Sequence, residues 1–142
     1  MPDKPAHDAE TGSVELTNNR EEIAALEERV VGRIEDLGYP KSARFAVMLA
    51  LEEAIANAFQ HGHRDLPDDT PIQVTFRVTK DHVQITVEDR GAGFDPRDLP
   101  DPTVEENISN PSGRGMMLIR AYMSEVSHND RGNRLSMTYR KP

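Results

Sequence analysis

Glu53 and Asn57 interrupt an otherwise apolar, helix-forming stretch, LEEAIANAFQHG, at residues 51–62. In a helix, residues i and i+4 share one face, so the carboxylate and the carboxamide would be neighbours. A carboxylate in this place is able to accept a proton from a hydroxyl that attacks phosphorus. An asparagine oxygen suits Mg²⁺, which binds few protein groups and keeps phosphates and waters. A solvated polar stripe is the simpler alternative for this pair taken alone.

A second polar stretch, DRGAG at residues 89–93, follows an alternating apolar strand. The odd-numbered residues of that strand point inward, and Asp89 is the next residue in the same register. An inward carboxylate beside Gly91 and Gly93 is suited to accept a hydrogen bond from an exocyclic amine such as adenine N6. An ordinary Asp-x-Gly turn explains these residues equally well.

A third stretch, GRG at residues 113–115, opens a helical pattern. Glycines at a helix start leave backbone N–H groups and the positive end of the helix dipole facing an anion such as phosphate. Arg114 could add a charge-assisted contact, although a flexible helix start with a solvated arginine is the alternative. The chain has no GxxxxGK[ST] motif, and GAGFDP has two of the three glycines of a dinucleotide-binding loop.

Two long helices are predicted before these glycine-rich stretches. Asn19 as N-cap and Glu22 three residues later form a capping-box pattern, which starts a helix that ends at Gly38. A second helix over about residues 41–61, with Gly62 as C-cap, is apolar around most of its circumference. We therefore expect this helix to be central, followed by a polar, proline-bounded connection.

The other elements are short strands and one further helix. Strict alternation over residues 72–79 and again over 83–87 predicts a β-hairpin. Weaker patterns predict an edge strand at residues 13–16, a helix over 113–126 and a last hairpin that turns at 129–133. Hairpins with helices grouped between them indicate an α+β fold. We expect a two-layer sandwich, with a mixed, mostly antiparallel sheet covered on one face by three helices.

The chain of 142 residues is predicted to form one domain. Residues 1–12 are polar and proline-containing, so we expect a disordered tail, with the domain over residues 13–142. Residues from about 95 to 112 contain four prolines and almost no apolar periodicity. A segment of this length inside a small domain is most often a functional lid or a disordered loop, and we expect a flexible lid.

Composition restricts the classes of partner. With 25 acidic and 17 Lys or Arg residues, the net charge of -8 offers no electrostatic footprint for nucleic acid or anionic lipid. There is no cysteine, and no stretch resembles a membrane span or a signal-peptide core. We expect a cytoplasmic protein whose partners are proteins or small molecules.

Taken in order, EAIAN at 53–57, DRGAG at 89–93, a variable lid and GRG at 113–115 resemble the N, G1 and G2 boxes of the GHKL ATPase superfamily. That superfamily has the Bergerat ATP-binding fold. NAFQHGH, GRGMMLIRAYMSEV and the small size resemble more closely the stand-alone anti-sigma factor serine-protein kinases of bacterial sporulation and stress-response switches. The resemblance covers about residues 13–140.

The resemblance implies a role for each matching residue. Glu53 matches the catalytic base and Asn57 the ligand of Mg²⁺. Asp89 matches the aspartate that recognises the adenine amine of ATP, with Gly91 and Gly93 leaving room for the ring. Four further residues match the junction of lid and helix, whose backbone amides meet the phosphates: Gly113, Arg114, Gly115 and Met116.

The resemblance also implies an activity and partners. Members of this family use ATP to phosphorylate a serine on an anti-anti-sigma partner of the STAS fold, bind and silence a sigma factor, and are usually homodimers. Two other functions stay open. One is a nucleotide-gated module that sequesters a partner without phosphate transfer. The other is a detached catalytic domain of a histidine kinase, which is less favoured because the first helix lacks an acceptor histidine.

Overall fold

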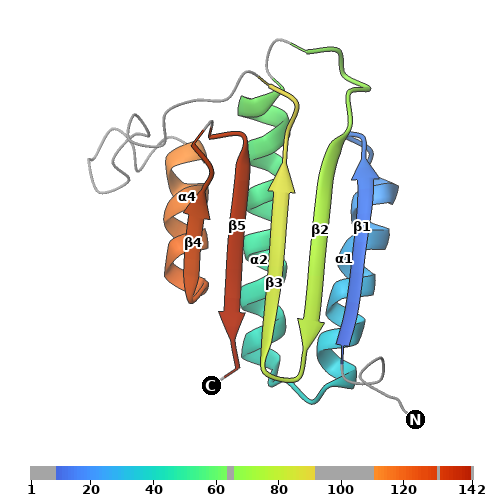
Figure 1. The fold of residues 1–142 in the computed structure, drawn as a ribbon, viewed down its shortest axis with the longest axis vertical. Coiled ribbons are helices and arrows are strands. Elements are labelled where there is room, and N and C mark those ends of the chain that lie inside the picture. The colour runs from blue at the N-terminus through green and yellow to red at the C-terminus, as the bar shows by residue number, and fades with distance from the viewer. Residues whose placement is uncertain (1–8, 64–65, 92–110, 131, 142) are drawn as a thin grey trace.

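The computed structural model describes residues 9–63, 66–91, 111–130 and 132–141 (Figure 1). Five strands form one antiparallel sheet in the order β1-β2-β3-β5-β4, and the helices cover one face of it (Figure 1). The predicted two-layer α+β fold is confirmed. In chain order the elements are β1 (Ala9–Leu16), α1 (Arg20–Asp36), α2 (Lys41–Asn57), η2 (Ala58–Gly62), β2 (Ile72–Thr79), β3 (His82–Glu88), α4 (Pro111–Tyr122), β4 (Glu125–His128) and β5 (Arg134–Arg140).

The edge strand β1 begins at Ala9, so the prediction of a disordered tail over residues 1–12 is wrong for residues 9–12. β1 pairs antiparallel with β2 along its whole length, from Ala9 opposite Thr79 to Leu16 opposite Ile72. Backbone hydrogen bonds to one neighbour hold such a strand, and they need no apolar side-chain pattern. Residues 1–8 lie outside the described part of the chain.

The predicted start of α1 is confirmed, with one difference in the cap. Asn19 Oδ1 accepts a hydrogen bond from the backbone N–H of Glu22 at 3.0 Å. The Glu22 carboxylate bonds to the N–H and hydroxyl of Thr17, each at 3.0 Å, instead of returning to the N-cap. The helix ends at Asp36, and Gly38 follows with a φ of 80°, a conformation that favours glycine.

α2 runs behind β3 and β5, between α1 and α4, and is the central helix of the layer (Figure 1). The helical path continues to Gly62 as predicted, but Ala58–Gly62 form the wider π-helical turn η2, closed by the His63 N–H bonded to Ala58 O at 2.9 Å. Gly62 is the last helical residue and has no positive φ, so its prediction as a C-cap is wrong. A different constraint, the close approach of Asp89, requires glycine there.

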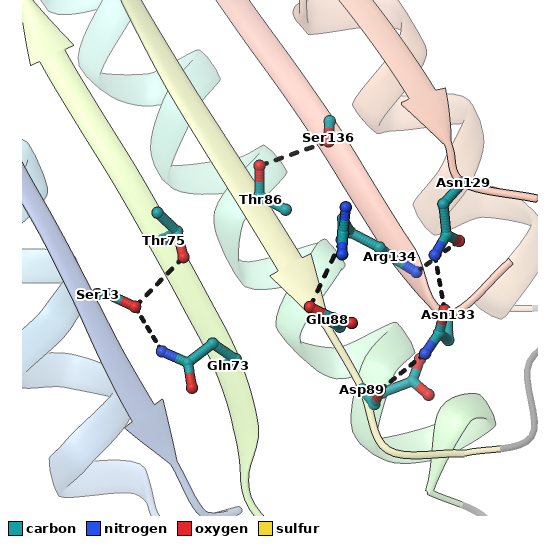
Figure 2. Close-up of polar contacts among 10 residues, drawn as sticks. All are labelled: Ser13, Gln73, Thr75, Thr86, Glu88, Asp89, Asn129, Asn133, Arg134 and Ser136. Carbon is teal, nitrogen blue, oxygen red and sulfur yellow. Dashed lines mark hydrogen bonds and ion pairs between the residues drawn. The ribbon is translucent and has the colours of Figure 1, made fainter. Parts of the chain in front are cut away.

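The central hairpin has the predicted register. Val74 pairs with Val87 and Val78 with Val83, and these inward side chains are buried against the helices. The opposite face of the sheet carries small polar side chains, such as the hydroxyls of Thr86 and Ser136, 3.4 Å apart (Figure 2). One face of this antiparallel sheet therefore packs on the core, and the other is polar.

The C-terminal part differs from prediction at both ends of its helix. α4 begins at Pro111, so residues 111 and 112 belong to the helix and not to the lid predicted over 95–112. α4 ends at Tyr122 instead of residue 126, because Glu125 already pairs with Thr138 as the first residue of β4. Residues 92–110, most of the predicted lid, lie outside the described residues. No helix in the described ranges is long and apolar enough to cross a membrane.

Two carboxyl groups face each other where α1 and α2 form a groove of about 430 Å³. Burial, then repulsion by Glu52 and a hydrogen bond with it, raises the pKa of Glu27 from 4.5 to about 7, while Arg20 partly opposes the rise. The folded chain therefore binds this proton more tightly than the unfolded chain. Stability from this group is greatest below pH 4.5 and is lost as the pH rises to about 7.

We expect Glu27→Gln to raise the free energy of unfolding by about 1 kcal/mol near pH 8.5 and to change it little near pH 4, which is below the pKa of this carboxyl in both the folded and the unfolded chain. This expected change in the free energy of unfolding is smaller than the pKa difference alone would give, because the side chain is half-buried and partly screened by solvent. Urea unfolding followed by circular dichroism measures both values. Glu28→Gln, at the exposed neighbouring position, is the control. An equal gain in the free energy of unfolding at both pH values, or in both variants, would contradict the raised pKa of Glu27.

Candidate functional site

The beginning of α4 lies against the polar residues of α2. A Cβ atom built on Gly115 would lie 2.9 Å from Glu53 Oε2 and 3.5 Å from both amide atoms of Asn57. Gly115 is buried, and the two α2 side chains are half-buried. A methyl group at residue 115 would crowd the carboxylate, so the Glu53 side chain would have to shift to make room for it. Two of the three stretches singled out in the sequence are therefore brought together.

The amide of Asn57 is incompletely paired. Its Nδ2 is buried, and no described residue accepts a hydrogen bond from it. Buried polar groups in native proteins almost always have partners, and exceptions are typical of sites that take a ligand or an ordered water. The position beside Gly115 thus fits a polar ligand that lies between α2 and α4.

Asp89 lies just beyond the end of β3 and is 8 % exposed, which confirms its predicted inward position. Its backbone is paired with the β4–β5 turn (Figure 2): its N–H donates to Asn133 O at 2.9 Å, and its C=O accepts from Asn133 Nδ2 at 3.3 Å. Asn129 Nδ2 donates to Asn133 Oδ1 at 2.8 Å and holds that side chain in turn. The Gly91 N–H bonds to Asp89 Oδ1 at 2.8 Å, so the Asp-x-Gly turn is present as well.

Two glycines pack around Asp89. A Cβ atom on Gly62 would overlap the Asp89 side chain, and one on Gly91 would overlap the carbonyl oxygen of Gly62. η2 and the end of β3 therefore touch backbone to backbone. The space left by Gly91 is filled by Gly62, so its predicted role in leaving room for a ring stays a prediction. Gly93 lies outside the described residues.

The remaining predicted site residues lie in the first turns of α4. Gly113 is the third and Arg114 the fourth residue of the helix, and not its opening. In a helix the first few N–H groups lack partners inside the helix, and Gly113 is the last residue of this set. Met116 is half-buried and packs against the core. The phosphate contacts expected of these residues stay predictions.

Three further residues, which the sequence did not single out as site residues, contact the segment that follows β3. Gly62 and His63 approach the segment after β3 from the helix side, and Asn133 approaches it from the β4–β5 turn. The sequence pattern indicated Gly62 only as a helix end, and His63 and Asn133 only as parts of a connection and a turn. No local signal in a single sequence distinguishes them, because their partners are 27 and 44 residues away.

Comparison with known proteins identifies the class. Residues 10–139 match the family described as the histidine kinase-like ATPase domain, and the chain belongs to this family. The chain is 31% identical over 103 residues to the serine/threonine-protein kinase BtrW of Bordetella bronchiseptica, covering 67% of this chain and 69% of the relative. It is 29% identical over 100 residues to the serine-protein kinase RsbW of Oceanobacillus iheyensis, covering 66% and 63%.

A solved structure supports the fold. The structure of the RsbU and RsbW domains of Rv1364c from Mycobacterium tuberculosis matches with a TM-score of 0.61 at 16% identity, over 93% of this chain and 32% of that one. The family predicted from EAIAN, DRGAG and GRG is thereby confirmed, together with its likeness to the small serine-protein kinases. The chain spans less than two thirds of the length of the RsbW relative from Oceanobacillus.

Gly91→Ala is expected to destabilise the fold by about 1–3 kcal/mol, because the added methyl group collides with the backbone carbonyl of Gly62 and neither backbone can move freely. Gly32→Ala is the matched control. A Cβ atom there meets nothing within 4 Å, and inside α1 alanine should stabilise by about 0.5–1 kcal/mol. Thermal and urea unfolding of both variants test this pair. A Gly91→Ala protein as stable as the wild type would show that the two backbones are not in contact.

Proposed function

We propose that this chain is an ATP-dependent protein serine kinase that acts as an anti-sigma regulator. The observation that carries the proposal is the contact of Gly115 with Glu53 and Asn57, which places a carboxylate and an unpaired amide at one junction of α2 and α4. Membership of an ATPase-domain family, and relatives named as serine-protein kinases, support ATP as the phosphate donor.

In this proposal ATP lies along α2, from the end of β3 to the start of α4. Asp89 accepts a hydrogen bond from the adenine amine. A buried carboxylate can only accept hydrogen bonds, so it favours a base with an amine donor over one with a carbonyl at the same place. The triphosphate lies at the junction near Gly115. Contacts through the amides of Arg114, Gly115 and Met116 would require the first turn of α4 to open, because these N–H groups lie beyond the free N–H groups of that turn.

The phosphate transfer itself needs one proton acceptor. The serine hydroxyl oxygen of the protein substrate attacks the γ-phosphorus, the bond from that phosphorus to the β–γ bridging oxygen breaks, and ADP leaves. Glu53 accepts the hydroxyl proton. Its carboxylate oxygen lies against Gly115, in a half-buried position where a substrate hydroxyl could approach.

Mg²⁺ would be held by the amide oxygen of Asn57 together with phosphate oxygens and waters, and it would neutralise charge that develops on the phosphates. The unpaired Nδ2 of the same amide is a donor, so it fits a hydrogen bond to a phosphate oxygen beside the ion. Among the described residues, no group of three or more His, Cys, Asp or Glu side chains could hold a metal ion. Asn57 is the one protein ligand that we propose for this ion.

The proposed protein substrate is a serine on an anti-anti-sigma partner of the STAS fold, and the proposed regulatory partner is a sigma factor bound by a homodimer of this chain. These partners come from the resemblance of EAIAN, DRGAG and GRG to the small anti-sigma kinases. A binding module without phosphate transfer would need no carboxylate beside Asn57. The presence of Glu53 at that place favours the kinase.

Glu53→Gln is expected to reduce transfer of labelled phosphate from Mg-ATP to a STAS partner by about 100-fold or more, since general base catalysis contributes about that factor. ATP affinity, measured by titration calorimetry, should stay within about twofold because the amide keeps the shape of the carboxylate. Glu52→Gln, the adjacent exposed carboxylate in the α1–α2 groove, is the matched control and should transfer normally. Undiminished transfer by Glu53→Gln would remove Glu53 as the base.

Asp89→Asn is expected to weaken ATP by about tenfold or more, because an amide donor would then face the adenine amine. Inorganic tripolyphosphate has no base, so its affinity should change little. Asp81→Asn, in the exposed hairpin between β2 and β3, is the control for loss of one negative charge. Equal losses for ATP and tripolyphosphate would argue against adenine recognition by Asp89.

A further inference from the structure

His63 is a buried polar residue to which the proposed reaction assigns no role. It follows η2 directly and is 6 % exposed. Its ring packs edge-on against Phe59, with centroids 5.7 Å apart and an interplanar angle of 75°. Its Nε2 accepts a hydrogen bond from the backbone N–H of Arg90 at 2.8 Å. A side chain from the helix layer thus holds the backbone directly after Asp89.

The peptide unit between Asp89 and Arg90 is held at both of its polar atoms. Its carbonyl oxygen, on Asp89, accepts from Asn133 Nδ2 at 3.3 Å, and its N–H, on Arg90, donates to His63 Nε2 at 2.8 Å. The two partners come from different parts of the fold, Asn133 from the β4–β5 turn and His63 from the residue after η2. A peptide held at both polar atoms cannot rotate without breaking a hydrogen bond, so the Asp89 backbone is fixed. The next peptide N–H, on Gly91, then holds Asp89 Oδ1 at 2.8 Å, which orients the carboxylate.

The contact also defines the chemical state of the imidazole. A backbone N–H can only donate, so Nε2 must be the unprotonated acceptor and the ring proton is on Nδ1. Nδ1 is buried and has no hydrogen-bond partner among the described residues. The ring therefore contributes one hydrogen bond, to the Arg90 N–H, and its other nitrogen provides no second anchor within the described structure.

We propose that His63 is a positioning residue for adenine recognition: by holding the Arg90 N–H it aims the Asp89 carboxylate at the exocyclic amine of the nucleotide. This inference rests on the proposed binding of ATP at Asp89. It assigns to His63 no contact with the nucleotide. Selectivity for adenine over other purines, more than affinity for the triphosphate, is the property that this residue controls.

The test compares two amide substitutions of His63. In His63→Gln the side-chain oxygen reaches the place of Nε2 and retains the acceptor, whereas in His63→Asn it reaches only the place of Nδ1. We expect the preference for ATP over inosine triphosphate, which has a carbonyl in place of the amine, to fall about tenfold in His63→Asn, the size of one lost buried hydrogen bond. His63→Gln should keep most of the preference. His82→Asn, at the opposite end of β3, is the control and should keep all of it.

The outcomes separate positioning from a general structural role. Equal loss of ATP, inosine triphosphate and tripolyphosphate binding in His63→Asn would indicate disruption of the fold and overturn the proposal, as would an unchanged preference. A wild-type protein that binds no ATP would overturn the proposed function and this inference together. Nitrogen-15 NMR of the unaltered protein gives a second test that needs no variant. An Nε2 that carries a proton would overturn the proposal, and an unprotonated Nε2 would support it.

Discussion

The close approach of α2 to two other elements is the constraint on which the candidate site depends. At its C-terminal end, Gly62 and Gly91 bring η2 and the end of β3 into backbone contact, with Asp89 packed against both. One to two turns earlier, Gly115 brings α4 against Glu53 and Asn57. A methyl group at any of these three glycines would push elements or functional side chains apart. The same helix supplies core residues such as Val47 and Leu51, so the site and the core cannot move independently.

The π-helical turn allows one continuous helix to contribute both to the hydrophobic core and to the candidate site. A regular α-helix through residue 62 would rotate the last residues differently, since each π turn adds one residue per hydrogen-bonded ring. With η2 in place, Gly62 faces Asp89 and the His63 ring faces the Arg90 N–H, while Ala58 stays buried in the core. The irregular turn lies at the functional end of the helix, as is frequent for such turns.

Features set by local pattern were predictable from the sequence, and features set by contacts between distant residues were not. The register of β2 and β3, and hence the inward position of Asp89, follows from strict alternation. The Asn19–Glu22 cap follows from residue type and spacing. By contrast, residues 9–12 of β1 are held by backbone pairing, which leaves no apolar signature. The π turn changes no hydrophobic period, and the His63–Arg90 bond joins residues 27 apart, so neither is visible locally. The contact of Gly115 with Asn57 depends on how α4 returns to α2, which no short motif encodes.

The two ends of the site differ in how far their polar groups are satisfied. At the β3 end, the Asp89 backbone, the Arg90 N–H and the Asn133 side chain all have partners, so a ligand that binds there finds a fixed arrangement and loses little to reorganisation. At the α4 end, the Asn57 amide is buried without a partner among the described residues, which costs stability until something pairs with it. A ligand that spans both ends would therefore be recognised by the fixed groups around Asp89. At the other end it would provide a partner for the buried Asn57 amide and so remove the cost of leaving that amide unpaired. The unsatisfied amide lies beside the same glycine, Gly115, that the Glu53 carboxylate contacts, so in the proposed reaction the group that gains a partner is next to the proposed base.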